Sequence, residues 1–379
     1  MELSPRGRFE AAIAGEEVDR PPVGYLYFGG GGAVLRELGA SFRDVYYSAG
    51  GMARAQLKAR ELFGHDNLMV PWGCMAVEAE AFGCDLLVKE DGYPMVMEPI
   101  LKDGGIKDLA MPDPERDGRM PTVLESIKIL RDETEGEVPI IGAACSPFIV
   151  AYQLRGFTEF LLDVMERPLE AHALLEIATE ASLGYIEAMV EEGAFGVLIE
   201  DSGAGAECID PLRCEEFITS YTRRLVDGIK AAGAYALVRN GSPMPYMEKE
   251  ISLLPDVLSL DWGDLDAIRS AHCWDCKTNH ARIGACQMRY CISETEGPCL
   301  MGNIDHTKVM VSAFYEEIYK EAMACLRSAA KRREGGFILS TGGEAPFATP
   351  PENMRALADA ARDFAKVQRL WPEIGRRQV

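Results

Sequence analysis

Short apolar runs alternate with helical stretches along this chain, and this alternation limits its fold more than any other feature. Eight runs have the length and the β-branched or aromatic content of strands, with at least one helical pattern between most neighbours. They cover residues 22–28, 67–72, 139–145, 196–201, 235–240, 257–261, 299–303 and 337–341. Because the runs are continuously apolar, they are typical of parallel strands buried on both faces. The pattern predicts a (β/α)8 TIM barrel, an α/β fold, with an open doubly wound sheet as the alternative.

The stretches between these runs carry helical periodicity, with apolar residues three and four positions apart. The clearest examples span residues 157–165, 169–192 and 211–232. Residues 85–98 differ, because Asp91-Gly92 separates two short apolar segments there and predicts a β-hairpin added to the barrel. The chain has no internal repeat, low-complexity tract or long linker, so we expect one domain over residues 1–379.

Charge and composition exclude several classes of function. Sixty acidic residues against 39 basic ones give a net charge of −21, which repels phosphate backbones and argues against nucleic-acid binding. No apolar run approaches the roughly 18 residues that cross a bilayer, so no membrane role is expected. Residues 1–15 lack the apolar core of a secretory signal, and eleven cysteines are an odd number outside any small disulfide scaffold. We therefore expect a cytoplasmic protein.

Polar residues that follow the predicted strands are the first candidates for a functional site, because the carboxyl ends of barrel strands form the active face. Three acids at these ends, Glu78, Asp201 and Glu344, are predicted to exchange protons, since burial can raise the pKa of a carboxyl towards neutrality. Other side chains at the same ends are predicted to bind substrate. They are Trp72, Cys74, Ser146, Arg239, Asn240, Asp261, Asn303 and His306.

Several of these candidates also have a purely structural alternative. Glu200 and Asp201 are adjacent, so they point to opposite sides of the barrel wall, one inward and one into the helix layer. Arg239 can equally be a structural partner of Asp261 or Glu200. The glycine run 29–32 either cradles a phosphate with its amides or forms a flexible loop over the barrel mouth.

Six segments spread over the chain carry motifs of a known family. They are RFEAAIAGEEVDRPPV (8–23), VPWGCMAVEAEAFGC (70–84), SPFIVAYQLRG (146–156), VLSLDWGDLD (257–266), LMGNID (300–305) and FILSTGGEAPFATPPENMRAL (337–357). Together they resemble the uroporphyrinogen decarboxylase superfamily, and in particular its corrinoid-linked methyltransferase branch. The resemblance implies a (β/α)8 barrel with an N-terminal helical arm, in agreement with the strand pattern.

Two departures from the family pattern narrow the activity that the resemblance implies. Its decarboxylases carry an RQAGR motif that binds the tetrapyrrole acetates, and residues 25–39 lack that motif here, which argues against uroporphyrinogen as substrate. Its thiol-methylating members hold zinc with a His-x-Cys pair and a later Cys, whereas the matching positions here are Val238, Asn240 and Gly343. Without zinc a thiol is not activated in this way, so an acceptor of the coenzyme M type is not expected.

Residues 272–298 are interpreted as a Cys-rich insertion, because the family pattern passes almost directly from the sixth helix to the seventh strand. Cys273, Cys276, Cys286 and Cys291 can supply the four thiolates of a structural zinc site, or three of them with His272 or His280. An iron–sulfur cluster has similar needs. Free thiols remain an alternative, since the spacing lacks the paired CxxC of a zinc ribbon.

The family resemblance and its departures together imply a corrinoid-dependent methyltransferase. It would move a methyl group between a small, for instance methoxylated, compound and the corrinoid of a partner protein. Ether cleavage needs the leaving oxygen to be protonated or bound to a Lewis acid, which Glu78, Asp201 or Glu344, or a metal held by some of them, can supply. A decarboxylase of a porphyrinogen or other polycarboxylate, and a non-catalytic barrel that binds a corrinoid or tetrapyrrole, are the alternatives, and a homodimer is left open.

Overall fold

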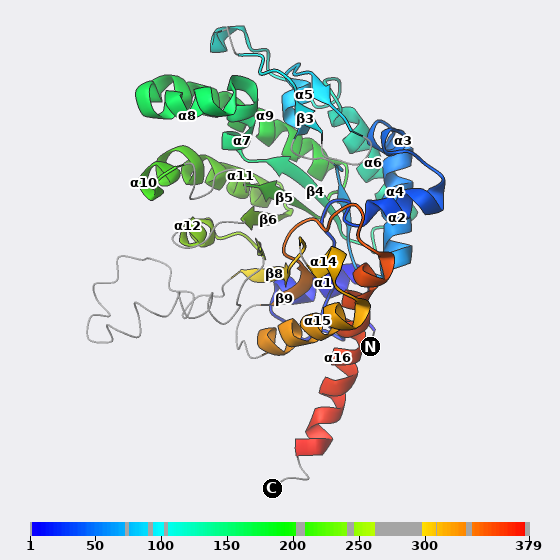
Figure 1. Ribbon diagram of the computed structural model, residues 1–379. Coiled ribbons are helices and arrows are strands. Elements are labelled where there is room, and N and C mark those ends of the chain that lie inside the picture. The colour runs from blue at the N-terminus through cyan, green and yellow to red at the C-terminus, as the bar shows by residue number, and fades with distance from the viewer. Residues whose placement is uncertain are drawn as a thin grey trace, which may run out of the picture.

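Seven parallel strands form a curved sheet, and helices surround it on the outside (Figure 1). The structure is a computed structural model that describes residues 2–72, 76–89, 94–101, 105–201, 209–240, 246–261, 298–307, 309–330 and 336–375. The strands are β1 (Leu68–Val70), β4 (Ile140–Cys145), β5 (Gly196–Glu200), β6 (Tyr235–Asn240), β7 (Val257–Leu260), β8 (Cys299–Ile304) and β9 (Phe337–Thr341), paired in this order. The predicted barrel is confirmed, with seven of its eight strands at the predicted places.

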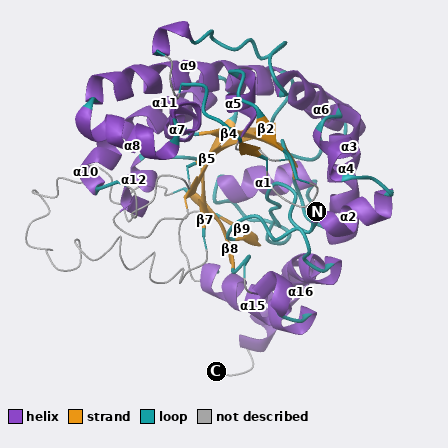
Figure 2. Ribbon diagram, turned by 45° about the horizontal axis from the view of Figure 1, so that its top comes forward, coloured by secondary structure: helices purple, strands orange, loops and turns teal. Residues whose placement is uncertain are grey.

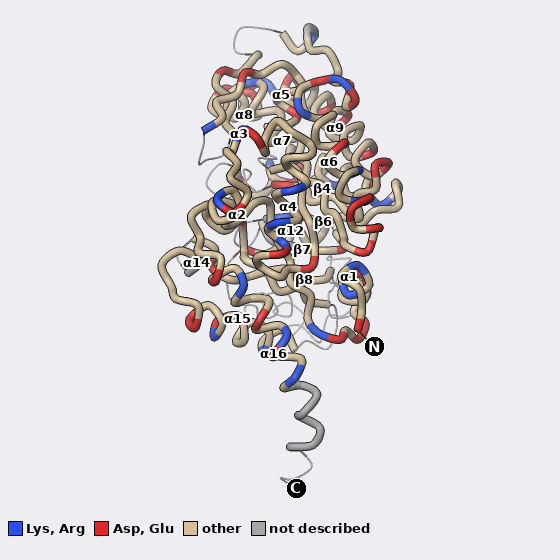
Figure 3. The backbone as a smooth tube through the Cα atoms, turned by 90° about the vertical axis from the view of Figure 1, so that its right-hand side faces the viewer, with Lys and Arg blue, Asp and Glu red and all other residues tan. Residues whose placement is uncertain are grey.

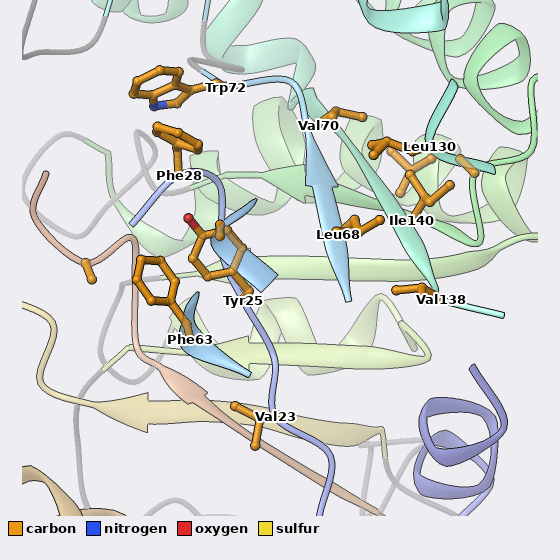
Figure 4. Packing of buried hydrophobic residues seen from close by; sticks show 14 of the residues in the cluster. Val23, Tyr25, Phe28, Phe63, Leu68, Val70, Trp72, Leu130, Val138 and Ile140 are labelled. Carbon is orange, nitrogen blue, oxygen red and sulfur yellow. The ribbon is translucent and has the colours of Figure 1, made fainter. Parts of the chain in front are cut away.

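The first predicted strand, residues 22–28, is instead an irregular extended segment that lies between β9 and β1 (Figure 4). On one side Val23 bridges Leu339 of β9. On the other side the Asn67 amide side chain replaces a strand ladder, because it accepts from Tyr25 N at 2.6 Å and donates to Tyr25 O at 3.0 Å. Tyr27 has a positive φ of 53°, which no regular strand contains. The eighth position of the barrel is therefore held by backbone hydrogen bonds to β9 and, towards β1, largely by the Asn67 side chain.

Helices form the outer layer (Figure 2). They are α1 (Pro5–Ile13), α2 (Gly31–Leu38), α3 (Phe42–Tyr46), α4 (Ala49–Phe63), α5 (Val77–Ala81), α6 (Met120–Glu133), α7 (Pro147–Arg155), α8 (Phe157–Glu166), α9 (Pro168–Glu191), α10 (Pro211–Cys214), α11 (Ser220–Ala231), α12 (Tyr246–Ser252), α14 (Val309–Ser312), α15 (Tyr315–Ala329) and α16 (Pro351–Gly375), with short turns η2 (Ile106–Asp108) and η3 (Glu215–Thr219). Pro5, Pro147, Pro168 and Pro211 begin their helices, where a missing amide hydrogen has no cost.

The predicted hairpin is confirmed in its two strands, β2 (Leu86–Leu87) and β3 (Met95–Val96), which pair in antiparallel fashion. Its predicted turn at Asp91-Gly92 lies outside the described residues. So do residues 272–297, which hold the four predicted metal ligands Cys273, Cys276, Cys286 and Cys291. The Cys-rich insertion, its metal and the single domain over residues 1–379 therefore stay predictions.

The N-terminal arm closes the end of the barrel at which the strands begin. Arg6 N donates to Glu137 O in the turn before β4, and the Phe9 ring packs edge-on against Phe195, which precedes β5. Inside the barrel Phe9 belongs to a cluster of buried apolar side chains from the strands, Leu198 and Leu237 among them. Because this end is closed and the interior is filled, a substrate can enter only from the end at which the strands stop.

Candidate active site at the barrel mouth

An ion pair between neighbouring strands lies at the mouth of the barrel. Glu200 ends β5, and Arg239 of β6 is its partner in the sheet register, so both side chains point to the same face. Arg239 Nη1 donates to Glu200 Oε1 at 2.9 Å and to Oε2 at 3.1 Å. The Tyr27 hydroxyl also donates to Glu200 Oε2, from the segment that lies between β9 and β1. Because Tyr27 reaches β5 from across the barrel, the ion pair faces the barrel interior.

Asp201, the neighbour of Glu200, faces the helix layer instead. Its Oδ2 accepts from Thr222 Oγ1 of α11 at 3.4 Å, and its carboxylate is hydrogen-bonded to Glu250 of α12. Burial raises the pKa of Asp201 to about 7 and raises the pKa of Glu250 well above its usual value. The negative charge of Asp201 adds to the shift at Glu250, so Glu250 carries the proton that the two acids share.

Glu78 lies in the first turn of α5, directly after the mouth-facing end of β1. Its Oε1 accepts from Cys145 N, at the end of β4, at 2.7 Å. Its Oε2 is buried and has no hydrogen-bond partner among the described residues. Burial raises the pKa of Glu78 to about 7, so this carboxyl can hold or release a proton at neutral pH.

Glu344 occupies the loop that follows β9. Its Oε1 accepts from Phe28 N at 3.2 Å, while its buried Oε2 has no partner in the described part of the chain. Burial raises the pKa of Glu344 to about 8, against a smaller opposing effect from a hydrogen bond to Trp72. The Trp72 ring lies 3.7 Å from the Phe28 ring and stacks on Phe347 at 6.1 Å, between centroids (Figure 4). Glu344 is therefore a neutral acid in an apolar, aromatic surrounding.

Gly343 packs directly against two nitrogen atoms of the mouth. A Cβ added to Gly343 would lie 2.6 Å from Arg239 Nη2 and 2.7 Å from His306 Nε2. On the opposite side of the ring, His306 Nδ1 lies 3.5 Å from Asp261 Oδ1. The absence of a side chain at position 343 is thus what makes room for a guanidinium and an imidazole.

A thiol-activating zinc ion does not fit this mouth. Val238, at the first matching position, packs in the apolar cluster between sheet and helices, and Gly343 offers no donor atom. The positive charge of Arg239 lies where the side chain of a third ligand would begin. Within the described ranges, no three His, Cys, Asp or Glu side chains are grouped so that they can hold a metal ion.

Four further predicted site residues have different surroundings. Ser146 is buried at the start of α7, and Trp72 belongs to the aromatic cluster beside Glu344. Asn303 is buried, and its Oδ1 lies 3.4 Å from Cys325 Sγ. Asn240 ends β6. Cys74 lies outside the described residues.

The glycine run 29–32 leads into α2 and forms its first two residues, and it is buried against the loop after Glu344. Gly30 N donates to Pro346 O and Gly32 N to Phe347 O, while Gly29 and Gly31 bond to backbone within their own turn. These amides therefore donate to backbone carbonyls of the protein itself. The run is neither the predicted flexible loop nor free to cradle a phosphate, because its lack of side chains serves close packing.

Comparisons with known proteins agree with this architecture. The model of the uroporphyrinogen decarboxylase (URO-D) family matches residues 4–364. A uroporphyrinogen decarboxylase of Anaeromyxobacter dehalogenans is 28% identical over 373 residues, which cover 94% of this chain and 98% of the relative. The methylcobamide:CoM methyltransferase MtaA of Methanosarcina barkeri is 28% identical over 368 residues, 96% of this chain and 98% of the relative.

A solved structure of a methyltransferase from Methanosarcina mazei superposes with a TM-score of 0.80 at 26% identity and covers 96% of this chain and 99% of that one. Decarboxylases and methyltransferases are thus equally similar in sequence, and members of both kinds are enzymes. The family match spans nearly the whole barrel, including every acid and base of the mouth described above. The chain belongs to the uroporphyrinogen decarboxylase family.

Proposed function

We propose that this protein is a methyltransferase that moves a methyl group between a small methoxylated substrate and the corrinoid of a partner protein. The names of the M. barkeri relative and the M. mazei structure support methyl transfer, and the methylcobamide in the former supports a corrinoid. Since decarboxylases are equally similar, the choice between the two activities depends on the mouth. The observation that carries the proposal is Glu344, a buried neutral acid with one unpartnered oxygen, next to Gly343.

The arginines near the N-terminus argue against a porphyrinogen substrate. Arg8 and Arg20 are held by Asp19 and Asp66 on the arm, at the closed end of the barrel. Arg36 is exposed on α2, and Arg239 already neutralises Glu200. A porphyrinogen brings several carboxylates, each of which needs a cation. The alternative of a polycarboxylate decarboxylase is therefore less well supported than methyl transfer.

Methyl transfer from an ether breaks a C–O bond and leaves negative charge on the oxygen. The Glu344 carboxyl donates its proton to that oxygen, which keeps the electron pair of the breaking bond while the methyl group passes to the corrinoid. A pKa of about 8 keeps Glu344 protonated at neutral pH. Glu78, whose pKa burial also raises, is the further candidate for this proton, whereas Asp201, a predicted proton carrier, faces the helix layer.

The proposed activity can be measured directly with cob(I)alamin and a panel of small methoxylated compounds under anaerobic conditions. We expect the absorbance of methylcobalamin to appear, no carbon dioxide from uroporphyrinogen, and no transfer from methylcobalamin to coenzyme M. Carbon dioxide release would instead identify a decarboxylase. Binding of cobalamin or a tetrapyrrole without turnover of any compound would identify the non-catalytic barrel.

Glu344→Gln is the variant that tests the proton donor. A positioned general acid contributes typically 10²- to 10⁴-fold, so we expect the rate of methyl transfer to fall by about that factor. In the unaltered protein the rate of methyl transfer should decline as the pH rises above about 8, because Glu344 then loses its proton. The rate of the variant should not show this decline. Glu352→Gln, at an exposed position of α16, is the control and should leave rate and pH profile unchanged.

A further inference from the structure

We propose that Arg239 and His306 form a binding site for a carboxylate of the substrate, in the part of the mouth where thiol-methylating relatives need a zinc ligand. This inference rests on the proposed function, because the substrate is identified as a methoxylated carboxylic acid only if the protein transfers methyl groups. Binding itself can be measured without methyl transfer.

The geometry of Arg239 leaves part of its guanidinium available. Nη1 is occupied by Glu200, whereas Nη2 makes no hydrogen bond to any described residue and packs against Gly343. The side chain is 12% exposed, so it is reachable from the mouth but largely shielded from water. A guanidinium has five donors in a planar fork, and charge-assisted bonds from it to a carboxylate are among the strong hydrogen bonds of proteins.

His306 supplies the second contact from a different strand end. Its Nε2 and Arg239 Nη2 both pack against Gly343, at 2.7 and 2.6 Å from the position that a Cβ on this residue would take. Nδ1 of the ring lies 3.5 Å from Asp261 Oδ1, and the side chain is 15% exposed. Burial holds the pKa of His306 below its usual value, so the ring is neutral at neutral pH until an anion arrives. A carboxylate beside the ring favours the imidazolium, in which both nitrogens donate. A carboxylate that enters the mouth thus meets Nη2 of Arg239 and gains a second donor when His306 takes up a proton.

Gly343 determines whether this site can form. Any side chain there would overlap the positions of both nitrogens, so Gly343→Ala must displace Arg239, His306 or both. The substitution removes no charged group from the Arg239 to Glu200 ion pair, while it disturbs the proposed site. Gly184→Ala is the matched control, because Gly184 lies within α9 and an added Cβ there meets no atom within 4 Å.

The test is calorimetric titration of the full chain with acetate, methoxyacetate and 4-methoxybenzoate, each paired with its amide. We expect each carboxylate that binds to do so at least roughly tenfold more tightly than its amide, as the loss of one charge-assisted bond predicts. Gly343→Ala and Arg239→Gln should remove this preference, and Gly184→Ala should keep it. Circular dichroism and thermal unfolding of Gly343→Ala report whether its fold is retained.

Two outcomes overturn the inference. One is equal binding of carboxylates and amides, or no binding of any of the three acids. The other is a folded Gly343→Ala that retains the full preference. The proposed function can fail independently of this site. Selective carboxylate binding without methyl transfer to cobalamin would support the site and contradict the methyltransferase activity. Methyl transfer from amides and acids at equal rates would support the methyltransferase and contradict the carboxylate site.

Discussion

Glu200 and Asp201 show how two adjacent carboxyls acquire different roles. Glu200 faces the barrel interior, where Arg239 and Tyr27 bind it as an anion. Asp201 faces α11 and α12, where burial raises its pKa to about 7 beside the protonated Glu250. The residues alone predict that the two point to opposite sides, but not which one points inward. Asp201 is one of the three predicted proton carriers, whereas Glu200, which faces the barrel interior, is not among the predicted site residues.

The shared proton of Asp201 and Glu250 makes stability depend on pH. Both pKa values are raised in the folded protein, so the folded state holds protons that the unfolded chain releases at pH values above about 4. This contribution is present in full below about pH 4, and it is lost as the pH rises through about 7. We expect denaturant titrations to show a free energy of unfolding that falls over this range.

Glu250→Gln should reduce that slope, because the amide donates the same hydrogen bond to an ionised Asp201 without a shared proton. Glu166→Gln, at an exposed position of α8, is the control and should keep the slope of the unaltered protein. An unchanged slope in Glu250→Gln would contradict the shared proton.

At the scale of elements, the segment 22–28 and the arm close the barrel without a regular eighth strand. Asp66 organises this closure: its carboxylate accepts from Arg8, from Arg20 and from Val23 N. Arg8 and Asp66 are both almost fully buried. The apolar run predicts a strand here because its composition is that of a strand. Asn67 and Asp66, however, hydrogen-bond to this segment through their side chains, and such contacts cannot be predicted from hydrophobic periodicity.

Asp66→Asn should therefore destabilise the protein strongly. Removing one partner of a buried ion pair typically costs about 3–5 kcal/mol, since the remaining charge stays out of water. Chemical denaturation at neutral pH measures this change. Glu10→Gln removes a comparable partner of Arg6 in a pair that is 46% and 42% exposed, and we expect at most about 1 kcal/mol there. Equal effects of the two substitutions would refute the role assigned to Asp66.

At the scale of the whole molecule, the net charge of −21 opposes the approach of any anion. Figure 3 shows acidic and basic positions interspersed over the outer helices. Among the described residues, no helix combines the length and the apolar character that crossing a membrane requires. A carboxylate substrate must therefore reach Arg239 against the field of the protein, and local hydrogen bonds hold it once it has entered.

Salt should accordingly speed the binding of an anionic substrate. Screening becomes effective at a Debye length of about 10 Å in 0.1 M salt, so stopped-flow association rates for 4-methoxybenzoate should rise with ionic strength, by at most about tenfold. The rates for 4-methoxybenzamide, which is uncharged, should not change. A rate for the carboxylate that falls with salt would show that a local positive field at the mouth outweighs the net charge.

Continuous apolar runs predict the barrel and the places of seven strands, because buried parallel strands need such runs, and motifs spread along the chain predict the family. The runs also place Glu78, Glu344, Arg239 and His306 after strand ends. Contacts in the folded protein, in contrast, show that Glu200 faces inward, that Tyr27 reaches it from across the barrel, and that Gly343 leaves room for Arg239 and His306. These facts depend on distances between segments far apart in the chain, which the closure of the barrel sets and local patterns do not encode.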